Sequence, residues 1–274
     1  MIPAAFEYVR AESADEALAA IAEHGDEAKF LAGGMSLIPL MKLRLATPTV
    51  LVDVARVQDL SYIRDAGDHL AIGALTRHRE LETSDVLASE CAVLRAVAAQ
   101  VGDNQVRHRG TLGGSVAHGD PASDLPAALV ALGATVVARS ADGERTIAAA
   151  DFFTGFLETA LREDELLTEI RVPKAGSGGF DYQKFNRRAQ DWAIVGAVAA
   201  TVAGERRVAL VNMGSTPIRC TSVEAALAGG ASIADAAALA ADGTEAPQDL
   251  NASVEYREHL ARVLVRRALE AASA

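Results

Sequence analysis

Two glycine-rich segments carry the groups in this sequence that are best suited to binding an anion. Residues 32–39 read Ala-Gly-Gly-Met-Ser-Leu-Ile-Pro, and residues 110–121 read Gly-Thr-Leu-Gly-Gly-Ser-Val-Ala-His-Gly-Asp-Pro. Glycine lets the backbone approach a ligand closely and reach positive φ, so that successive N–H groups can converge on one anion. The hydroxyl groups of Ser36, Thr111 and Ser115 add neutral donors beside them. Two such segments could enclose a diphosphate from both sides, as an extended dinucleotide requires.

The alternative for each Gly-Gly pair is a tight turn with no ligand. For one pair alone the turn is the better interpretation. The two pairs together, each with hydroxyl groups nearby, favour ligand binding. We expect both pairs to lie in turns that follow strands.

Other signatures of catalysis are missing from the sequence. It contains no GxxxxGK[ST], GxGxxG, HExxH or GxSxG pattern, which argues against P-loop nucleotidases, ordinary Rossmann dinucleotide sites, zinc proteases and serine hydrolases. The histidines are scattered, so no metal site is predicted. The only cysteines, Cys91 and Cys220, cannot supply the four thiolates of an iron–sulfur cluster.

Composition narrows the class of protein further. The chain has 274 residues, half of them apolar, and a net charge of −11, which disfavours binding to nucleic acids. No uninterrupted apolar run reaches the roughly 18 residues of a membrane-spanning helix, and no secretory signal is visible. We therefore expect a cytoplasmic protein without a transmembrane segment.

Hydrophobic periodicity and turn residues predict an α+β chain in three parts. Residues 1–53 read as β-α-β-loop-β, with a helix capped by Ser13. Residues 55–173 read as a hairpin, two helices around a polar stretch at 102–124, and three further strands. After a flexible glycine-rich linker at 173–179 come three strands and three helices. Four aromatic side chains are expected in the core: Phe152, Phe153, Phe156 and Trp192.

The two glycine segments, taken at full length, resemble one known family. Residues 32–46 with Leu-Val-Asp at 51–53, and residues 111–126, are similar to the FAD-binding medium subunits of the molybdenum hydroxylases. That family includes aerobic carbon monoxide dehydrogenase, xanthine dehydrogenase, and N-heterocycle and aldehyde dehydrogenases. Shorter matches at 184–191 and 262–269 extend the resemblance over nearly the whole chain, and the first motif is most similar to the carbon monoxide dehydrogenase branch.

The resemblance implies a fold and a division into domains. Residues 1–175 would form a two-lobed FAD-binding domain of the vanillyl-alcohol-oxidase (PCMH) type, with lobes at about 1–55 and 56–175. Residues 176–274 would form a C-terminal domain of the carbon monoxide dehydrogenase flavoprotein type, with a three-stranded antiparallel sheet and helices.

The resemblance also implies the residues that contact FAD. Matched position by position, they are Phe30, Leu31, Ala32, Gly33, Gly34, Met35, Ser36, Leu37, Thr111, Gly113, Gly114, Ser115, Asp124, Leu167 and Lys184. The first eight would wrap the diphosphate, and no residue is assigned a catalytic role. Met35 stands where relatives often carry Gln or His, which removes one side-chain hydrogen bond. For Lys184, an exposed strand lysine is an equal alternative, and His118 is not expected to attach the flavin covalently.

The implied function is electron transfer within a complex. A large partner would carry the molybdenum cofactor and a small partner two [2Fe–2S] clusters, in a dimer of heterotrimers that is cytoplasmic or peripheral at the inner membrane. This chain would pass electrons through non-covalent FAD to an external acceptor. The resemblance favours the medium subunit of an aerobic carbon monoxide dehydrogenase, and the alternative is the flavin subunit of a xanthine, N-heterocycle or aldehyde dehydrogenase. Two further functions stay open: a free-standing NAD(P)H-dependent flavin reductase, and a non-catalytic scaffold that has lost its cofactor.

Overall fold

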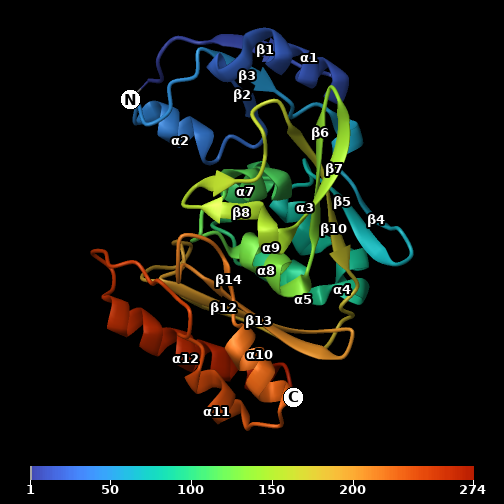
Figure 1. Ribbon diagram of the computed structural model, residues 1–274. Helices are drawn as coiled ribbons and strands as arrows, with labels where there is room; N and C mark the ends of the chain where they lie inside the picture. Colours follow the sequence, from blue (N-terminus) through green and yellow to red (C-terminus); the bar gives the residue numbers. More distant parts are fainter. Residues whose placement is uncertain (1) are drawn as a thin grey trace.

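The computed structural model describes residues 2–274 of the chain (Figure 1). A small parallel sheet forms its N-terminal lobe. Its strands run in the order β1-β3-β2, because the two outer strands both pair with β3. The elements of this lobe are β1 (Glu7–Arg10), α1 (Ala14–His24), a 3₁₀ turn (Gly25–Glu27), β2 (Ala28–Leu31), α2 (Leu37–Lys42) and β3 (Val50–Asp53). Ser13 caps α1 as predicted, since its hydroxyl accepts a hydrogen bond from the Glu16 amide at 3.1 Å. The first glycine segment therefore lies between β2 and α2.

The second lobe is built on a five-stranded antiparallel sheet in the order β4-β5-β10-β6-β7. Its strands are β4 (Ile63–Asp65), β5 (His69–Gly73), β6 (Thr135–Ser140), β7 (Gly143–Ala148) and β10 (Leu166–Pro173), preceded by a 3₁₀ turn (Gln58–Leu60). Its helices are α3 (His78–Thr83), α4 (Asp85–Glu90), α5 (Ala92–Ala99), α6 (Asn104–Arg109), α7 (Leu112–His118), α8 (Asp124–Leu132) and α9 (Ala149–Phe152). A short hairpin of β8 (Phe153–Gly155) and β9 (Glu158–Thr159) follows α9. All residues of α8 are buried, because it packs against α5 on one side and the C-terminal sheet on the other.

The C-terminal part is an antiparallel sheet backed by three helices (Figure 1). Its elements are β11 (Phe180–Phe185), β12 (Val195–Val202), β13 (Glu205–Val211), β14 (Ile218–Arg219), α10 (Thr221–Ala228), α11 (Ile233–Ala238) and α12 (Val254–Ala271). We predicted three strands; β14 is a fourth, and its two residues are too few to show a period. Alternate residues of β12 pack in different cores, Val198 toward the second lobe and Ala197 toward the helices. Both faces of β12 are therefore buried, which explains its continuous apolar sequence.

Two further expectations are wrong in detail. The predicted flexible linker is fixed to the second lobe, because the amides of Ala175 and Gly176 both donate to the Glu90 carbonyl at 2.9 Å. Two aromatic residues expected in the core are exposed, Phe156 by 65% and Trp192 by 57%. Among residues 2–274, no helix combines the length and the apolar character needed to cross a membrane.

Candidate functional site

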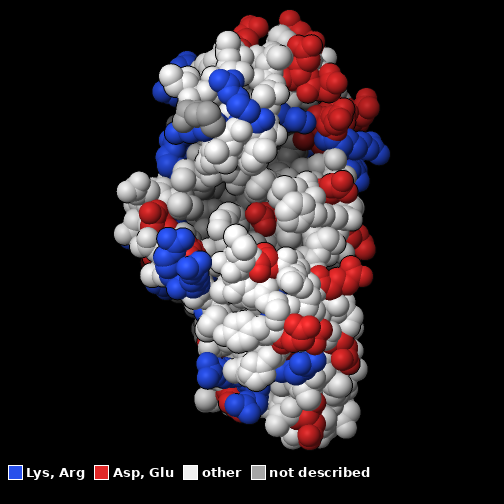
Figure 2. Space-filling model, turned by 90° about the vertical axis from the view of Figure 1, so that its left-hand side faces the viewer, with Lys and Arg blue, Asp and Glu red and all other residues white. Residues whose placement is uncertain are grey.

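A cavity of about 630 Å³ lies where the two lobes and the C-terminal part meet. Figure 2 shows the molecule hollowed below its upper lobe. The fifteen residues predicted to contact FAD all line this cavity: Phe30, Leu31, Ala32, Gly33, Gly34, Met35, Ser36, Leu37, Thr111, Gly113, Gly114, Ser115, Asp124, Leu167 and Lys184. The fold thus brings all three parts of the chain to one enclosed space, which has the size and concave shape of a cofactor site.

The first glycine segment exposes a row of unused backbone donors to this cavity. Within residues 2–274, the amides of residues 33–37 donate no hydrogen bond, and the Ser36 hydroxyl has no partner either. Gly34 has φ +74°, a left-handed conformation that glycine adopts without strain. Because unsatisfied amides inside a protein are costly, five consecutive ones at a cavity wall indicate a ligand with several acceptor oxygens.

The second glycine segment is not the turn after a strand that we predicted. Gly113 and Gly114 lie in the first turn of α7, and the amides at this end are already used. Leu112 donates to the Thr76 carbonyl at 2.9 Å, Gly113 to the Ala74 carbonyl at 2.8 Å, and Gly114 to the Thr111 hydroxyl at 3.0 Å. The Thr111 hydroxyl and the carbonyls of Thr76 and Ala74 therefore occupy the amides that our sequence interpretation reserved for an anion.

Close packing explains the glycines of α7 instead. A Cβ atom at Gly113 would lie 2.6 Å from the Cβ of Ala74, so no side chain fits between the helix and the end of β5. The neighbouring Ser115 is half-buried at the cavity, and its hydroxyl makes no hydrogen bond to any described residue. The second segment can thus offer a ligand the Ser115 hydroxyl and a stretch of glycine backbone without side chains.

The two glycine segments also touch each other. A Cβ atom at Gly33 would lie 2.3 Å from the carbonyl oxygen of Arg109 and 2.9 Å from the Cα of Gly110. The segment after β2 and the segment before α7 therefore form one continuous wall of the cavity, as their predicted common function requires. This approach is possible only without a side chain at Gly33.

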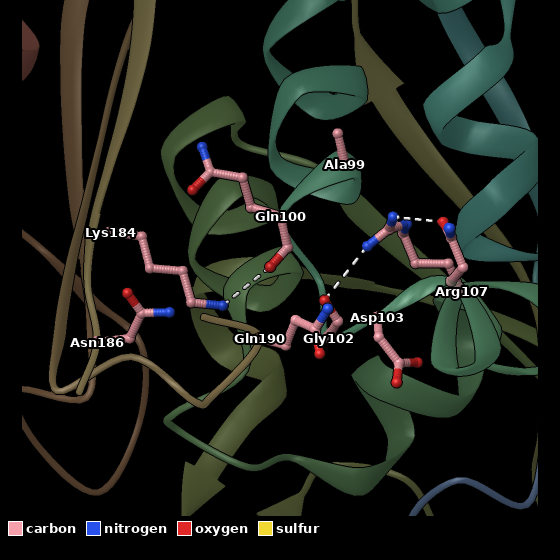
Figure 3. Close-up of a pocket in the computed structure, with 9 residues that line it drawn as sticks. Ala99, Gln100, Gly102, Asp103, Arg107, Lys184, Asn186 and Gln190 are labelled. Carbon is pink, nitrogen blue, oxygen red and sulfur yellow. Dashed lines mark hydrogen bonds between the residues drawn. The ribbon is translucent and has the colours of Figure 1, made fainter. Parts of the chain in front are cut away.

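A buried ion pair joins the second lobe to the C-terminal sheet at the cavity. The ammonium group of Lys184 lies 2.8 Å from a carboxylate oxygen of Asp124. Figure 3 shows its second contact, a hydrogen bond of 3.0 Å to the Gln100 carbonyl. The Tyr182 hydroxyl donates to the other Asp124 oxygen. Burial raises the pKa of Asp124, and the donors Lys184 and Tyr182 oppose that rise.

Lys184 is not the exposed strand lysine that we kept as an alternative, since only 5% of its side chain is accessible. An ammonium group has three donors, and the two contacts above leave one of them for a ligand. Figure 3 shows this group at a smaller polar cleft of about 330 Å³, which shares Lys184, Gly102 and Gln190 with the main cavity. The smaller cleft at the boundary between the second lobe and the C-terminal part therefore adjoins the main cavity.

Our sequence interpretation missed several residues that line the cavity. His78 is buried there, and among the described residues nothing bonds its Nδ1 atom. Val101 and Gly102 follow α5, and Trp192 comes from the loop before β12. The sequence offers no local signal for these four, because only the tertiary fold brings them to the glycine segments.

The charge state of His78 leads to a prediction about acid stability. Burial and the neighbouring cations Arg107 and Arg77 lower its pKa from 6.5 to about 4. The unfolded chain therefore binds a proton that the folded chain does not, so stability falls as the pH falls from 6.5 toward 4, by about 3 kcal/mol in total. Urea unfolding across this range should show a smaller acid loss in His78→Gln than in the parent protein. The exposed His259, changed to Gln, should leave the acid loss unchanged; equal losses in both variants would contradict the assignment.

Comparison with known proteins identifies the class of protein that this fold and cavity define. Residues 4–175 match the family model described as "FAD binding domain in molybdopterin dehydrogenase", and residues 180–272 match "CO dehydrogenase flavoprotein C-terminal domain". The chain therefore belongs to the family of FAD-binding medium subunits of molybdenum hydroxylases, which are oxidoreductases of several subunits. The resemblance read from the motifs is confirmed, as is the two-lobed α+β fold followed by an antiparallel sheet.

Particular relatives are similar over their whole length. The carbon monoxide dehydrogenase medium chain of Hydrogenophaga pseudoflava is 40% identical, covering 99% of this chain and 98% of that one. The 6-hydroxypseudooxynicotine dehydrogenase complex subunit alpha of Paenarthrobacter nicotinovorans is 39% identical, covering 98% and 95%. A solved structure of the Hydrogenophaga pseudoflava carbon monoxide dehydrogenase that lacks the Mo-pyranopterin moiety superposes with a TM-score of 0.96, covering 100% of this chain and 99% of that one at 40% identity.

Proposed function

We propose that the cavity binds FAD non-covalently and that its diphosphate accepts hydrogen bonds from the amides of residues 33–37. The observation that carries this proposal is the row of unused donors at the cavity wall. A diphosphate presents several acceptor oxygens in a row, which matches consecutive N–H groups. The hydroxyls of Ser36, Thr111 and Ser115 lie at the same cavity and supply neutral donors beside them.

The remaining predicted contacts fit the rest of the cofactor. Leu167 gives an apolar surface for an aromatic ring, and the third ammonium donor of Lys184 is available to a ring carbonyl or a hydroxyl. Asp124 holds that ammonium group in place. In this proposal residues 1–175 bind the cofactor, with lobes at about 1–55 and 56–175, and residues 176–274 complete the cavity through Lys184.

FAD, when bound, supplies a centre that takes up electrons one at a time and gives them up in pairs. The chain would work as the electron-transfer subunit of a complex, between [2Fe–2S] clusters on a small partner and an external acceptor. A large partner with the molybdenum cofactor would oxidise the substrate, and a dimer of heterotrimers is the proposed assembly. The residues of this chain then hold and orient the cofactor and carry out no substrate chemistry.

Two substrates of the whole complex deserve separate tests. Carbon monoxide is the first candidate, because this chain is similar to a carbon monoxide dehydrogenase medium chain over the full length. A second candidate is an N-heterocyclic or aldehyde substrate. The 6-hydroxypseudooxynicotine dehydrogenase subunit is 39% identical to this chain, and a glyceraldehyde dehydrogenase medium chain of Sulfolobus acidocaldarius is 36% identical. The substrate pocket would lie on another chain, so the two candidates are compared on the whole complex.

The test uses the complex purified from its host through a tag on this chain. Carbon monoxide, 6-hydroxypseudooxynicotine and glyceraldehyde are each offered with a water-soluble quinone as the two-electron acceptor. Stripping the flavin should leave substrate-dependent bleaching of the iron–sulfur absorbance intact but lower quinone reduction by 100-fold or more, and added FAD should restore it. Turnover that survives flavin removal would contradict electron transfer, and NAD(P)H oxidation by the isolated chain would favour a free-standing reductase.

A further inference from the structure

His78, the first residue of α3, is a buried histidine at the cavity wall. Only 4% of the residue is accessible, and neither ring nitrogen forms a hydrogen bond with a residue in the described part of the chain. A buried polar side chain without a partner costs free energy, and most such groups in folded proteins are bonded. The folded chain alone therefore gives no reason for an imidazole at this position, whereas a ligand in the cavity would.

The backbone fixes where this ring lies. The His78 amide donates to the Gly110 carbonyl at 3.0 Å, and the neighbouring Arg77 pairs with Thr111 in an antiparallel bridge. A Cβ atom at Gly110 would lie 2.7 Å from the ring atom Cδ2 of His78 and 2.8 Å from Nε2. The edge of the ring that carries Nε2 therefore lies directly against Gly110, an approach that requires glycine there.

Gly110 is also the residue that Gly33 touches. A Cβ atom at Gly33 would lie 2.9 Å from the Cα of Gly110, and Gly33 begins the row of unused amides at residues 33–37. His78 and Gly33 line the same cavity and both contact Gly110, so the Nε2 edge lies beside the Gly33 end of that row. A phosphate oxygen bound at this end is within reach of the imidazole.

The charges around His78 favour an anion. Its charged neighbours Arg77 and Arg107 are cations, which cannot accept the N–H hydrogen of the ring. Arg107 is paired with Glu82 at 2.9 Å, but the guanidinium of Arg77 donates to a backbone carbonyl, that of Arg109. The described chain thus offers the imidazole no acceptor, and the cation beside it favours a negatively charged one.

We infer that His78 is a further FAD-binding residue, whose neutral imidazole donates a hydrogen bond through Nε2 to an oxygen of the diphosphate. The inference rests on the proposed binding of FAD in this cavity and adds a donor that neither glycine segment supplies. It also assigns the tautomer. The proton is on Nε2 and Nδ1 keeps its lone pair, so that no N–H group of the ring is buried without an acceptor.

Two substitutions separate the hydrogen bond from the shape of the side chain. The amide nitrogen of His78→Gln can take the place of Nε2, whereas His78→Met fills a similar volume without a donor. The complex, purified through a tag on this chain and stripped of flavin, is titrated with FAD and followed by flavin fluorescence. We expect His78→Met to bind FAD about 10-fold more weakly than the parent or worse, and His78→Gln to stay within about 3-fold. The exposed His259, changed to Met, should bind FAD like the parent.

Two further measurements distinguish this contact from a merely structural role. Because the ring has no partner in the described chain, His78→Met should leave the urea midpoint of the flavin-free chain at neutral pH unchanged or raise it. In the FAD-loaded protein, His78→Met should shift at least one of the phosphate resonances in the ³¹P NMR spectrum. The His259→Met control should shift neither.

The outcomes separate this inference from the function on which it rests. If the parent complex does not take up FAD, the proposed site itself fails. If the parent binds FAD and His78→Met binds it equally well, only the hydrogen bond from His78 is wrong. The same holds if His78→Met and His78→Gln lose affinity to the same extent, because shape then explains the loss. A lower urea midpoint of flavin-free His78→Met, or unshifted phosphate resonances, would also overturn the assignment.

Discussion

Changing Gly33 to Ala is expected to weaken FAD binding by about 100-fold, which corresponds to about 2.7 kcal/mol. The added Cβ atom would lie 2.3 Å from the carbonyl oxygen of Arg109, a separation that real Cβ atoms do not show. Backbone lies on both sides of this contact, so the two glycine segments must move apart and the row of amides loses its alignment. Titration of the flavin-free protein with FAD, followed by flavin fluorescence, measures the change.

Gly178 provides the matched control for that substitution. No atom lies within 4 Å of a Cβ atom built there, and its backbone is outside the left-handed region, so Gly178→Ala should bind FAD like the parent. Thermal unfolding of the flavin-free variants checks that both are folded. Equal affinity in the two variants would mean that the contact between the segments does not matter for the cofactor.

The second large effect is expected at the ion pair between Asp124 and Lys184. Asp124→Asn should destabilise the protein by about 3–5 kcal/mol, because it leaves the Lys184 ammonium buried without a counter-charge. The loss should appear in urea unfolding of the flavin-free chain, since the pair joins two parts of the fold before any cofactor binds. Part of the loss is the hydrogen bond from Tyr182, which becomes a neutral one.

A double variant separates charge from shape at the same place. Asp124→Asn/Lys184→Met removes both charges and should recover most of the stability that Asp124→Asn loses, because no isolated charge remains buried. The exposed pair Arg188 and Asp191 serves as the comparison, and Asp191→Asn there should cost less than about 1 kcal/mol. If the double variant is as unstable as the single one, packing and not charge explains the effect.

The sequence predicted the first glycine segment better than the second for a physical reason. Around Gly33 and Gly34 the information is local: a strand ends, a residue needs positive φ, and the amides stay unbonded. At Gly113 and Gly114 the deciding facts are tertiary. Glycine has a low helix propensity, so the pair indicates a loop, but the Thr111 cap and the contact with Ala74 select a helix.

Exposure of apolar side chains could not be predicted from residue type. Trp192 and Phe156 are aromatic, which favours the core, yet the fold leaves both exposed. Nothing in the sequence around His78 indicated that it lines the cavity, because the other residues that line the cavity come from other elements. All fifteen matched positions nevertheless line one cavity, so the resemblance predicted where these residues lie, while their contact with FAD stays a prediction.

Hydrogen exchange at single-residue resolution tests the central claim most directly, because the two glycine segments differ in the flavin-free protein. The amides of residues 33–37 have no acceptor within the described chain, whereas those of residues 112–115 are bonded. Addition of FAD should slow exchange at residues 33–37 by at least 10-fold and leave residues 112–115 nearly unchanged. If exchange at residues 33–37 stays the same on addition of FAD, the diphosphate does not bind these amides and the proposed site is wrong.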